Sequence, residues 1–330
     1  METILITGGA GFIGSNLIDK LLEQGNKVIT IDNFNPYYDP QIKEKNIFSI
    51  KKTIKEKGIP SNNFKLYRED IRNKEILRMI FEENKIDLVI HLAAMAGVRS
   101  SIINPEYYYE VNVMGTLNLL NIIKEKEIKK LIFASSSSIY GNNQKIPFSE
   151  DDIVDNPISP YAASKKAGEL LCYTYHHLYD IDIACLRIFT VYGPRQRPDL
   201  AIHKFIKLIL QDKVIPFYGN GNTKRDYTYI DDIVDGINVT IIWIKKNRNK
   251  YEIFNLGSSR TISLVEMIKT IEGVLNKKAN LKKLPMQPGD VNRTYSDIKK
   301  AKKILNYDPK IVFKEGIKKF IEWVKNNNSM

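Results

Sequence analysis

The sequence feature that most constrains the fold is a glycine-rich turn near the N-terminus. The run Gly-Gly-Ala-Gly-Phe-Ile-Gly at Gly8–Gly14 follows a short apolar segment, Thr3–Thr7, and opens a helical pattern, Phe12–Gln24. Glycine tolerates positive backbone φ angles and lets backbone N–H groups approach an anion without an intervening Cβ. A strand, a turn of this kind and a helix in succession predict an α/β domain that binds a dinucleotide pyrophosphate.

The first half of the chain alternates short β-branched segments with longer helical patterns. This alternation predicts βαβ units and a parallel sheet, and uninterrupted apolar strands indicate burial on both faces of that sheet. Further strands are predicted at Lys27–Asp32, Phe64–Arg68, Leu88–Leu92, Leu131–Ser135 and Ile183–Ile188, and further helices at Gln41–Lys57, Val111–Lys126 and Tyr161–Leu178.

The second half of the chain differs from the first in the length and composition of its predicted elements. After about Val191 the elements are shorter and contain more Pro and Gly. We therefore expect a Rossmann-type doubly wound parallel sheet with a smaller C-terminal α/β substrate lobe. The predicted division places a dinucleotide-binding domain at residues 1–190 and a nucleotide-sugar-binding lobe at 191–330. A segment near 230–260, including a helix at Asp231–Lys245, is expected to return to the first domain.

An acidic residue follows the second predicted strand. Asp32 lies eighteen residues after Gly14, where a carboxylate can accept hydrogen bonds from both ribose hydroxyls of an adenosine. The same carboxylate would repel a 2′-phosphate. The sequence therefore favours NAD over NADP as the cofactor.

A tyrosine and a lysine share one face of a predicted helix. Tyr161 and Lys165 are four residues apart, and a serine run, Ser135–Ser138, follows a buried strand upstream. The lysine charge is expected to lower the pKa of the phenol toward neutrality and make it a usable general base. Hydroxyl groups at the carboxyl edge of a parallel sheet lie where such folds bind ligands.

Charge and cysteine content exclude several other classes. The net charge is +12, but the lysines are scattered rather than arranged in a basic stripe with aromatic residues, so we expect a polyanionic small substrate and no nucleic acid. Two cysteines and four histidines without ligand spacing predict no disulfide framework and no metal. The absence of a signal-peptide core and of a long apolar segment predicts a cytoplasmic protein without membrane contact.

The motifs described above, together with several others, make the chain resemble the extended short-chain dehydrogenase/reductase family over nearly its whole length. The motifs that carry the resemblance are Gly8–Gly14, Asp32, Asp70-Ile71, His91-Leu92-Ala93-Ala94, Asn112 with Gly115-Thr116, the serine run before Tyr140-Gly141, Tyr161–Lys165, and Arg187 to Pro194.

The resemblance implies a role for each matching position. Tyr161 would be the base, Lys165 would also bond the nicotinamide ribose, and Ser136 would relay or orient the sugar hydroxyl. The cofactor contacts it implies are Gly8, Gly11, Phe12, Ile13, Gly14, Asp32, Asn33, Asp70, Ile71, Leu92, Ala93, Ala94, Asn112, Tyr161 and Lys165. The substrate contacts it implies are Arg99, Ser136, Ser137, Tyr161, Thr190, Arg197, Tyr218, Arg225 and Asp290.

Two features narrow the expected reaction within the family. Sugar dehydratases of the family carry an Asp-Glu pair where this chain has Ser137-Ser138, so elimination would lack its acid and base. The segments Phe34–Asp39 and Arg195–Ala201 look like those of UDP-glucuronate 4-epimerases, in which a threonine and an arginine recognise the sugar carboxylate. Thr190 and Arg197 hold those positions, and a guanidinium grips a carboxylate through two parallel hydrogen bonds.

The resemblance therefore implies oxidation of the sugar at C4 by bound NAD, rotation of the 4-keto sugar, and return of hydride to the opposite face. Three alternatives stay open: a UDP-glucuronate decarboxylase that makes UDP-xylose, a UDP-glucose 4-epimerase without carboxylate selectivity, and a dinucleotide-sensing protein without chemistry. Gln287 departs from UDP-galactose-type epimerases, which carry arginine three residues before the aspartate that matches Asp290. Family members usually form homodimers, here through Val111–Lys126 and Tyr161–Leu178.

Overall fold

The structure is a computed structural model that describes residues 2–285 and 291–327. Its centre is a sheet of seven parallel strands in the order β10-β6-β5-β4-β1-β2-β3. These strands are β1 (Thr3–Thr7), β2 (Lys27–Ile31), β3 (Phe64–Tyr67), β4 (Leu88–His91), β5 (Lys130–Ser136), β6 (Asp182–Ile188) and β10 (Tyr251–Leu256).

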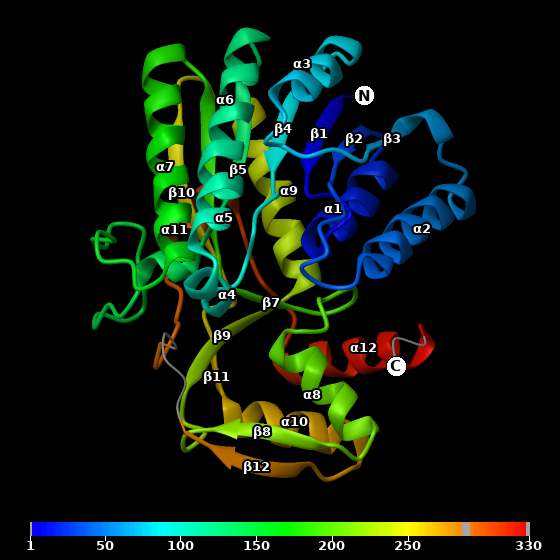
Figure 1. The fold of residues 1–330 in the computed structure, drawn as a ribbon, viewed down its shortest axis with the longest axis vertical. Helices are drawn as coiled ribbons and strands as arrows, with labels where there is room; N and C mark the ends of the chain where they lie inside the picture. The colour runs from blue at the N-terminus through cyan, green and yellow to red at the C-terminus, as the bar shows by residue number, and fades with distance from the viewer. Residues whose placement is uncertain (1, 286–290, 328–330) are drawn as a thin grey trace.

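Helices cover both faces of this sheet (Figure 1). The alternation of side chains along β1 sends Ile4 and Ile6 into one core and Leu5 into the other. The first face carries α1 (Phe12–Glu23), α2 (Pro40–Glu56) and α9 (Ile230–Lys246), and the second carries α3 (Lys74–Glu83), α6 (Gly115–Glu125) and α7 (Pro160–Tyr179).

The lower part of Figure 1 is a smaller lobe built mainly from the C-terminal half of the chain. Its strands form two small sheets, in the orders β11-β9-β7 and β12-β8. The strands are β7 (Thr190–Tyr192), β8 (Val214–Tyr218), β9 (Lys224–Tyr229), β11 (Thr261–Ser263) and β12 (Asn280–Leu284). Besides α9, the helices of this half are α8 (Ala201–Leu210), α10 (Leu264–Leu275), α11 (Lys299–Leu305) and α12 (Phe313–Asn326).

Short helical turns connect the larger elements. They are η1 (Ser61–Asn63), α4 (Val98–Ile103), α5 (Pro105–Tyr109), the π-helical turn η2 (Glu110–Met114) and η3 (Ser137–Tyr140).

The predicted fold class is confirmed, and every strand predicted in the first half is present with its ends shifted by at most one residue. The helix predicted at Asp231–Lys245 is also present, as α9, and it packs against α1 while β10 pairs with β6. The helix predicted to begin at Val111 begins instead as the π turn η2 and becomes α-helical at Gly115. The division of the chain at residue 190 stays a prediction.

Candidate active site

A cavity of about 430 Å³ opens at the carboxyl ends of the parallel strands. It lies where the strand order reverses between β1 and β4, the position at which doubly wound sheets leave a crevice for a ligand. The predicted site residues found in its wall are Gly8, Gly11, Phe12, Ile13, Gly14, Asp32, Asn33, Asp70, Ile71, Leu92, Ala93, Ala94, Ser136, Ser137, Tyr161, Lys165, Thr190 and Arg197.

Some predicted residues are not in this wall. Arg99, Asn112, Tyr218 and Arg225 lie elsewhere in the described part of the chain. Asp290 and Gln287 lie outside the described residues.

The glycine-rich turn is closed by backbone contacts that leave no room for side chains. Gly8 has a φ of +75°, and a Cβ on it would lie 2.8 Å from the backbone nitrogen of Ala93. A Cβ on Gly14 would collide with the carbonyl oxygen of Gly8. The glycines therefore allow β1, the turn and the segment after β4 to approach closely.

The N-terminus of α1 is prepared for an anion. Its N-cap residue is Gly11, no side chain accepts a hydrogen bond there, and the first turn carries no acidic residue. By contrast, Ser159 caps α7 through its hydroxyl. Because uncapped N-terminal amides and the helix dipole both favour negative charge, this turn fits a pyrophosphate.

The carboxylate of Asp32 is held in a fixed orientation. Its Oδ2 accepts from the backbone N–H of Ala10 at 3.1 Å, and its Oδ1 accepts from the N–H of Phe34 at 3.0 Å. Lys43 also donates to Oδ1 at 2.7 Å from α2, a contact that the sequence analysis missed. Lys43 forms an ion pair with Asp32 and so offsets the negative charge that would repel a 2′-phosphate. The preference of the site for NAD over NADP therefore rests more on the hydrogen bonds that Asp32 can accept from the ribose than on charge repulsion.

Asp70 is not a helix cap, because Asn73 accepts the capping hydrogen bond of α3. Burial alone would raise the pKa of Asp70, but hydrogen bonds from Arg72 and Asn33 hold that pKa below its ordinary value. The result is a charged acceptor at the cavity wall beside Ile71.

His91 at the end of β4 joins three segments of the site. The hydroxyl of Thr116 donates to the Asn112 carbonyl at 2.6 Å, so it accepts from His91 Nε2 at 3.0 Å. The hydroxyl of Thr7 accepts from the Ala93 N–H at 3.1 Å, so its proton points to His91 Nδ1 at 2.6 Å. The network is satisfied by the neutral Nε2–H tautomer.

Acid should therefore destabilise the protein through His91. Burial, and then the charge of Lys165, lower its pKa to about 3 from the ordinary 6.5. Below pH 6.5 the unfolded chain binds a proton that the folded chain refuses, so stability present above that pH is lost as the pH falls toward 3. We expect wild type to lose about 1.4 kcal/mol per pH unit more than a His91→Gln variant over this range. Urea unfolding between about pH 7 and about pH 5 measures the difference, and parallel pH curves would contradict it.

Asn112 is not among the residues that line the cavity, and its cofactor contact stays a prediction. Its Oδ1 accepts from the Met95 N–H at 2.7 Å, and its Nδ2 donates to the Met95 carbonyl and to the Ser164 hydroxyl, both at 2.9 Å. With these bonds made, the buried amide ties the segment after β4 to α7. It supports the cavity wall from behind, and the π turn around it places it there.

Ser136, Tyr161 and Lys165 converge from two elements. Ser136 ends β5, whereas the other two lie on the first turns of α7, whose N-terminus is fixed by the Ser159 cap. Lys165 donates to the carbonyl of Ala134 at 2.6 Å. Burial lowers the pKa of Lys165 to about 8.

The expected lowering of the tyrosine pKa by Lys165 is not present in this structure. Burial raises the pKa of Tyr161, and the Ser136 hydroxyl and the charge of Arg197 only partly oppose that rise. The ammonium group of Lys165 is directed to the Ala134 carbonyl instead of the phenol. The tyrosine is therefore a neutral phenol until further positive charge enters the cavity.

Arg197 reaches the cavity from the loop after β7, on which Thr190 also lines the wall. Its Nε and Nη2 donate to the two carboxylate oxygens of Asp199 at 3.1 and 2.7 Å. Its Cζ lies 4.9 Å from the ring centre of Tyr37 and 5.7 Å from that of Tyr38. Burial alone would lower the pKa of Arg197, but Asp199 raises it, so the group is a permanent cation at the wall.

A buried ion pair joins β6 to α7, and the sequence did not predict it. Arg187 on β6 donates through Nε and Nη2 to the two carboxylate oxygens of Glu169 on α7, both at 3.0 Å. The side chains are 2% exposed, and Ser135 on β5 donates to the same carboxylate at 2.6 Å. Arg187 also donates to the Tyr140 hydroxyl at 3.0 Å. This network fixes α7 against the edge of the sheet that carries Ser136.

Three predicted substrate residues lie around the lobe. Arg99 on α4 lies over the ring of Tyr218 at the end of β8, with 5.6 Å between Cζ and the ring centre. Arg225 lies on β9 and donates to the Lys224 carbonyl at 2.9 Å. The first contact joins the segment after β4 to the lobe.

Other properties of the described residues bear on the class of protein. Cys172 and Cys185 are buried free thiols. Within residues 2–285 and 291–327, no cluster of three or more His, Cys, Asp or Glu is suited to a metal ion. No helix in the same part of the chain has the length and hydropathy needed to span a membrane.

Known proteins match this chain over nearly its whole length. Residues 5–320 match the family described as GDP-mannose 4,6 dehydratase. The UDP-glucuronate 4-epimerase of Thermodesulfobacterium geofontis is 48% identical over 328 residues, which are 99% of this chain and 97% of that relative.

Solved structures give the same picture. The UDP-glucuronic acid 4-epimerase of Bacillus cereus, in complex with UDP-glucuronic acid and NAD, has a TM-score of 0.88 at 37% identity and covers 98% of this chain and 99% of its own. The UDP-glucose 4-epimerase of Thermotoga maritima, with UDP-glucose, has a TM-score of 0.88 at 31% identity, over 99% of this chain and 100% of its own.

Proposed function

This chain belongs to the NAD-dependent epimerase/dehydratase family of extended short-chain dehydrogenases/reductases, and we propose that it inverts C4 of UDP-glucuronate to give UDP-galacturonate. One observation carries the proposal: a single cavity brings Tyr161, Lys165 and Ser136 together with the phosphate-binding turn and with Arg197. The first group suits oxidation of an alcohol, and the arginine suits a substrate with a carboxylate.

NAD fits the residues of this cavity. The uncapped amides at the start of α1 would hold the pyrophosphate, Asp32 the adenosine ribose, and Asp70 with Ile71 the adenine. Lys165 would bond the nicotinamide ribose. When bound, NAD accepts hydride from C4 of the sugar and later returns it, so no external redox partner is consumed.

Tyr161 is the proposed base. It removes the proton of the sugar 4-hydroxyl, directly or through Ser136, and gives it back after the 4-keto sugar has turned about its diphosphate link. The raised pKa of Tyr161 must fall for this step, and the positive charge of an oxidised nicotinamide bound in the cavity would lower it.

Arg197 and Thr190 are the proposed carboxylate contacts. With a C6 carboxylate the 4-keto sugar is a β-keto acid, which loses CO2 when the C5–C6 bond aligns with the carbonyl π system. An epimerase must hold the carboxylate charged and out of that alignment. A cationic side chain at the wall, beside the hydroxyl of a neighbouring strand, supplies the required contacts.

The opposite end of the substrate is assigned to the lobe. We propose that Tyr218 and Asp290 lie near the uracil and its ribose and that Arg225 binds the diphosphate, with Arg99 beside them. The contact between Arg99 and Tyr218 supports this part of the proposal, because it joins the rim of the cavity to the lobe.

NMR analysis of purified protein incubated with UDP-glucuronate tests the function. UDP-galacturonate is the expected product. UDP-xylose and CO2 would favour the decarboxylase, and turnover of UDP-glucose without reaction of UDP-glucuronate would favour an epimerase that lacks carboxylate selectivity. No turnover of any of these sugars would favour a protein that binds the dinucleotide without chemistry.

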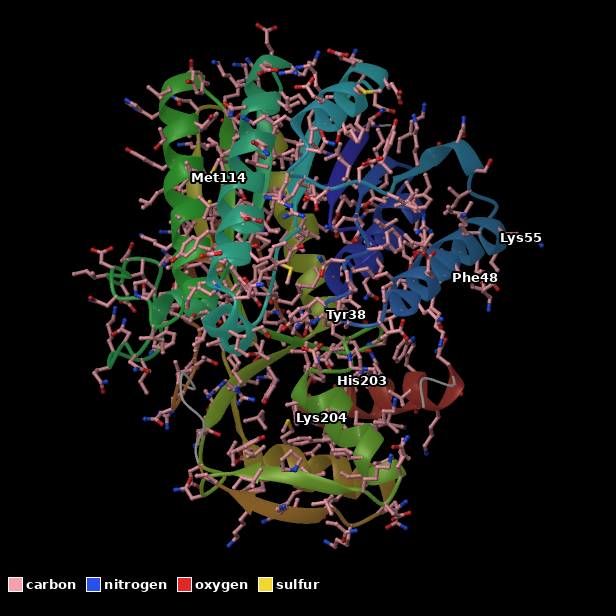
Figure 2. The ribbon with its side chains drawn as sticks, in the orientation of Figure 1. Tyr38, Phe48, Lys55, Met114, His203 and Lys204 are labelled. Carbon is pink, nitrogen blue, oxygen red and sulfur yellow. The ribbon has the colours of Figure 1, made fainter. Side chains whose placement is uncertain are left out.

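We also propose a homodimer formed through η2, α6 and α7. Exposed apolar side chains follow this face: Met114 is 50% exposed, Leu170 57% and Tyr173 54%. Figure 2 shows Met114 on the side of the molecule away from Phe48 of α2. Exposed apolar side chains on neighbouring helical segments are typical of a surface that packs on a second copy.

Leu170→Glu should therefore dissociate the dimer, because it places a charge in an apolar interface. Light scattering should give a mass near twice 38.0 kDa for wild type and near 38.0 kDa for the variant. Phe48→Glu is the matched control, since Phe48 is 71% exposed on another helix. A wild type that scatters as one chain would refute the dimer.

The remaining assignments concern setting and partners. We propose that the enzyme acts in the cytoplasm, where free thiols such as those of Cys172 and Cys185 persist, and that it binds no nucleic acid. Its positive charge serves to attract the anionic nucleotide sugar.

A further inference from the structure

The guanidinium group of Arg197 is held in a defined plane by its surroundings. Asp199 accepts from Nε and Nη2, which are the two donors of the side edge. Tyr37 and Tyr38 lie against the group, and Nη1 makes a long 3.5 Å contact with the Ala96 carbonyl. The bidentate pair therefore leaves the end edge, formed by Nη1 and the second proton of Nη2, for another carboxylate.

The loop that carries Arg197 is anchored immediately before it. Arg195 donates to the Ser15 carbonyl at 2.8 Å and to Asp19 at 2.6 Å, both on α1. The side chain of Gln196 donates to the Val191 carbonyl at 2.9 Å. With its backbone tied down, Arg197 can alter its direction mainly through its own side-chain torsions, and Asp199 opposes that movement.

The direction of this guanidinium matters because of the chemistry of the 4-keto intermediate. Decarboxylation breaks the C5–C6 bond, passes its electron pair through C5 to the C4 carbonyl oxygen, and releases CO2 while C5 takes up a proton. The step needs the C5–C6 bond perpendicular to the carbonyl plane. A carboxylate gripped at a fixed place holds the bond away from that geometry, whereas a swinging grip permits it.

We propose that Asp199 is a positioning residue that fixes the plane of Arg197 and thereby suppresses decarboxylation of the 4-keto intermediate. This role rests on the proposed function, because only a uronic acid substrate forms a β-keto acid. Asp199 is not among the residues that line the cavity, so the proposed effect on the intermediate passes through Arg197. Its side chain is 43% exposed, and it holds the guanidinium of Arg197 through the ion pair.

The test is the product ratio of an Asp199→Asn variant. Asparagine keeps the size of the side chain but offers one acceptor oxygen, so it cannot pair with both Nε and Nη2. We expect the ratio of decarboxylated UDP-pentose to UDP-galacturonate, measured by NMR, to rise at least about tenfold, the scale of one charge-assisted hydrogen bond. Reduced cofactor should also accumulate on the enzyme, because loss of the ketopentose interrupts the return of hydride.

The matched control is Asp212→Asn, which removes one oxygen of another loop carboxylate that pairs with Lys277 away from the cavity. It should leave the ratio unchanged. An unchanged product ratio in Asp199→Asn overturns the positioning role. If the KM for UDP-glucuronate is also lower in that case, Asp199 only competes with the substrate carboxylate for Arg197. If wild type itself makes no UDP-galacturonate, the proposed function fails before the variant is considered.

Discussion

Tyr161→Phe is expected to lower the rate of C4 epimerisation by about 10²–10⁴-fold while the protein keeps its NAD. The substitution removes only the phenolic oxygen, which is the proposed proton acceptor, and leaves the ring that packs edge-on against Tyr108 with 6.3 Å between ring centres. The measurement is the steady-state rate with UDP-glucuronate, followed by NMR, together with the cofactor content of the purified variant.

Tyr173→Phe is the control for this experiment. It makes the same chemical change three turns along α7, at a side chain that is 54% exposed and far from the cavity wall. It should retain wild-type turnover. Undiminished turnover in Tyr161→Phe would remove Tyr161 from the role of base, and loss of NAD from that variant would point to a binding defect instead.

Glu169→Gln should lower the free energy of unfolding by about 3–5 kcal/mol. The side chain of Arg187 is 2% exposed, and although burial would lower its pKa, Glu169 and Tyr140 raise that pKa above its ordinary value. Because a guanidinium group stays protonated in proteins, Arg187 remains charged when Glu169 is neutralised, and an unpaired buried charge is strongly unfavourable. Urea unfolding measures the change, which should appear as a lower midpoint.

Glu315→Gln is the matched control, because Glu315 pairs with Lys319 one turn along α12 with both side chains over 40% exposed. A pair of this kind contributes less than about 1 kcal/mol. Equal losses in the two variants would contradict the importance of burial. A negligible loss of unfolding free energy in Glu169→Gln would show that another group compensates the charge of Arg187.

Local sequence signals were sufficient for the framework of the fold. The run Leu88-Val89-Ile90 is apolar without interruption, and it lies in the buried strand β4. Gly8–Gly14 forms the tight turn that its composition requires. Helix α3 was not predicted, although Asn73 marks its start and Leu77, Ile80 and Phe81 form its buried face.

The candidate site was predictable where a motif sits at the end of a strand. Ser136 and Asp32 follow buried strands, and the topology of a parallel sheet brings such positions to one edge. Asn112 follows no strand, and its burial behind the wall depends on Met95 and Ser164, which are distant in sequence. The contacts that bury Asn112 could therefore not be predicted from its motif, and its role as a cofactor contact stays a prediction.

Pairing between distant charged groups was the part that the sequence could not supply. Lys43 meets Asp32 only because α2 comes close to the end of β2, and Glu169 meets Arg187 only because α7 packs against β6. These partners alter the charge of a site as much as the motif residues do. The expectation that Lys165 lowers the pKa of Tyr161 was wrong for this structure for the same reason, since the Ala134 carbonyl holds the ammonium group.

The proposed epimerisation depends on a hydride that leaves C4 and returns to the same carbon within one active site. The direct measurement uses UDP-glucuronate labelled with deuterium at C4, with NMR analysis of the product made in ordinary water without added reduced cofactor. Retention of deuterium at C4 of UDP-galacturonate is the predicted result. Inversion with hydrogen from water at C4, or no inversion by protein that holds NAD, would contradict the account.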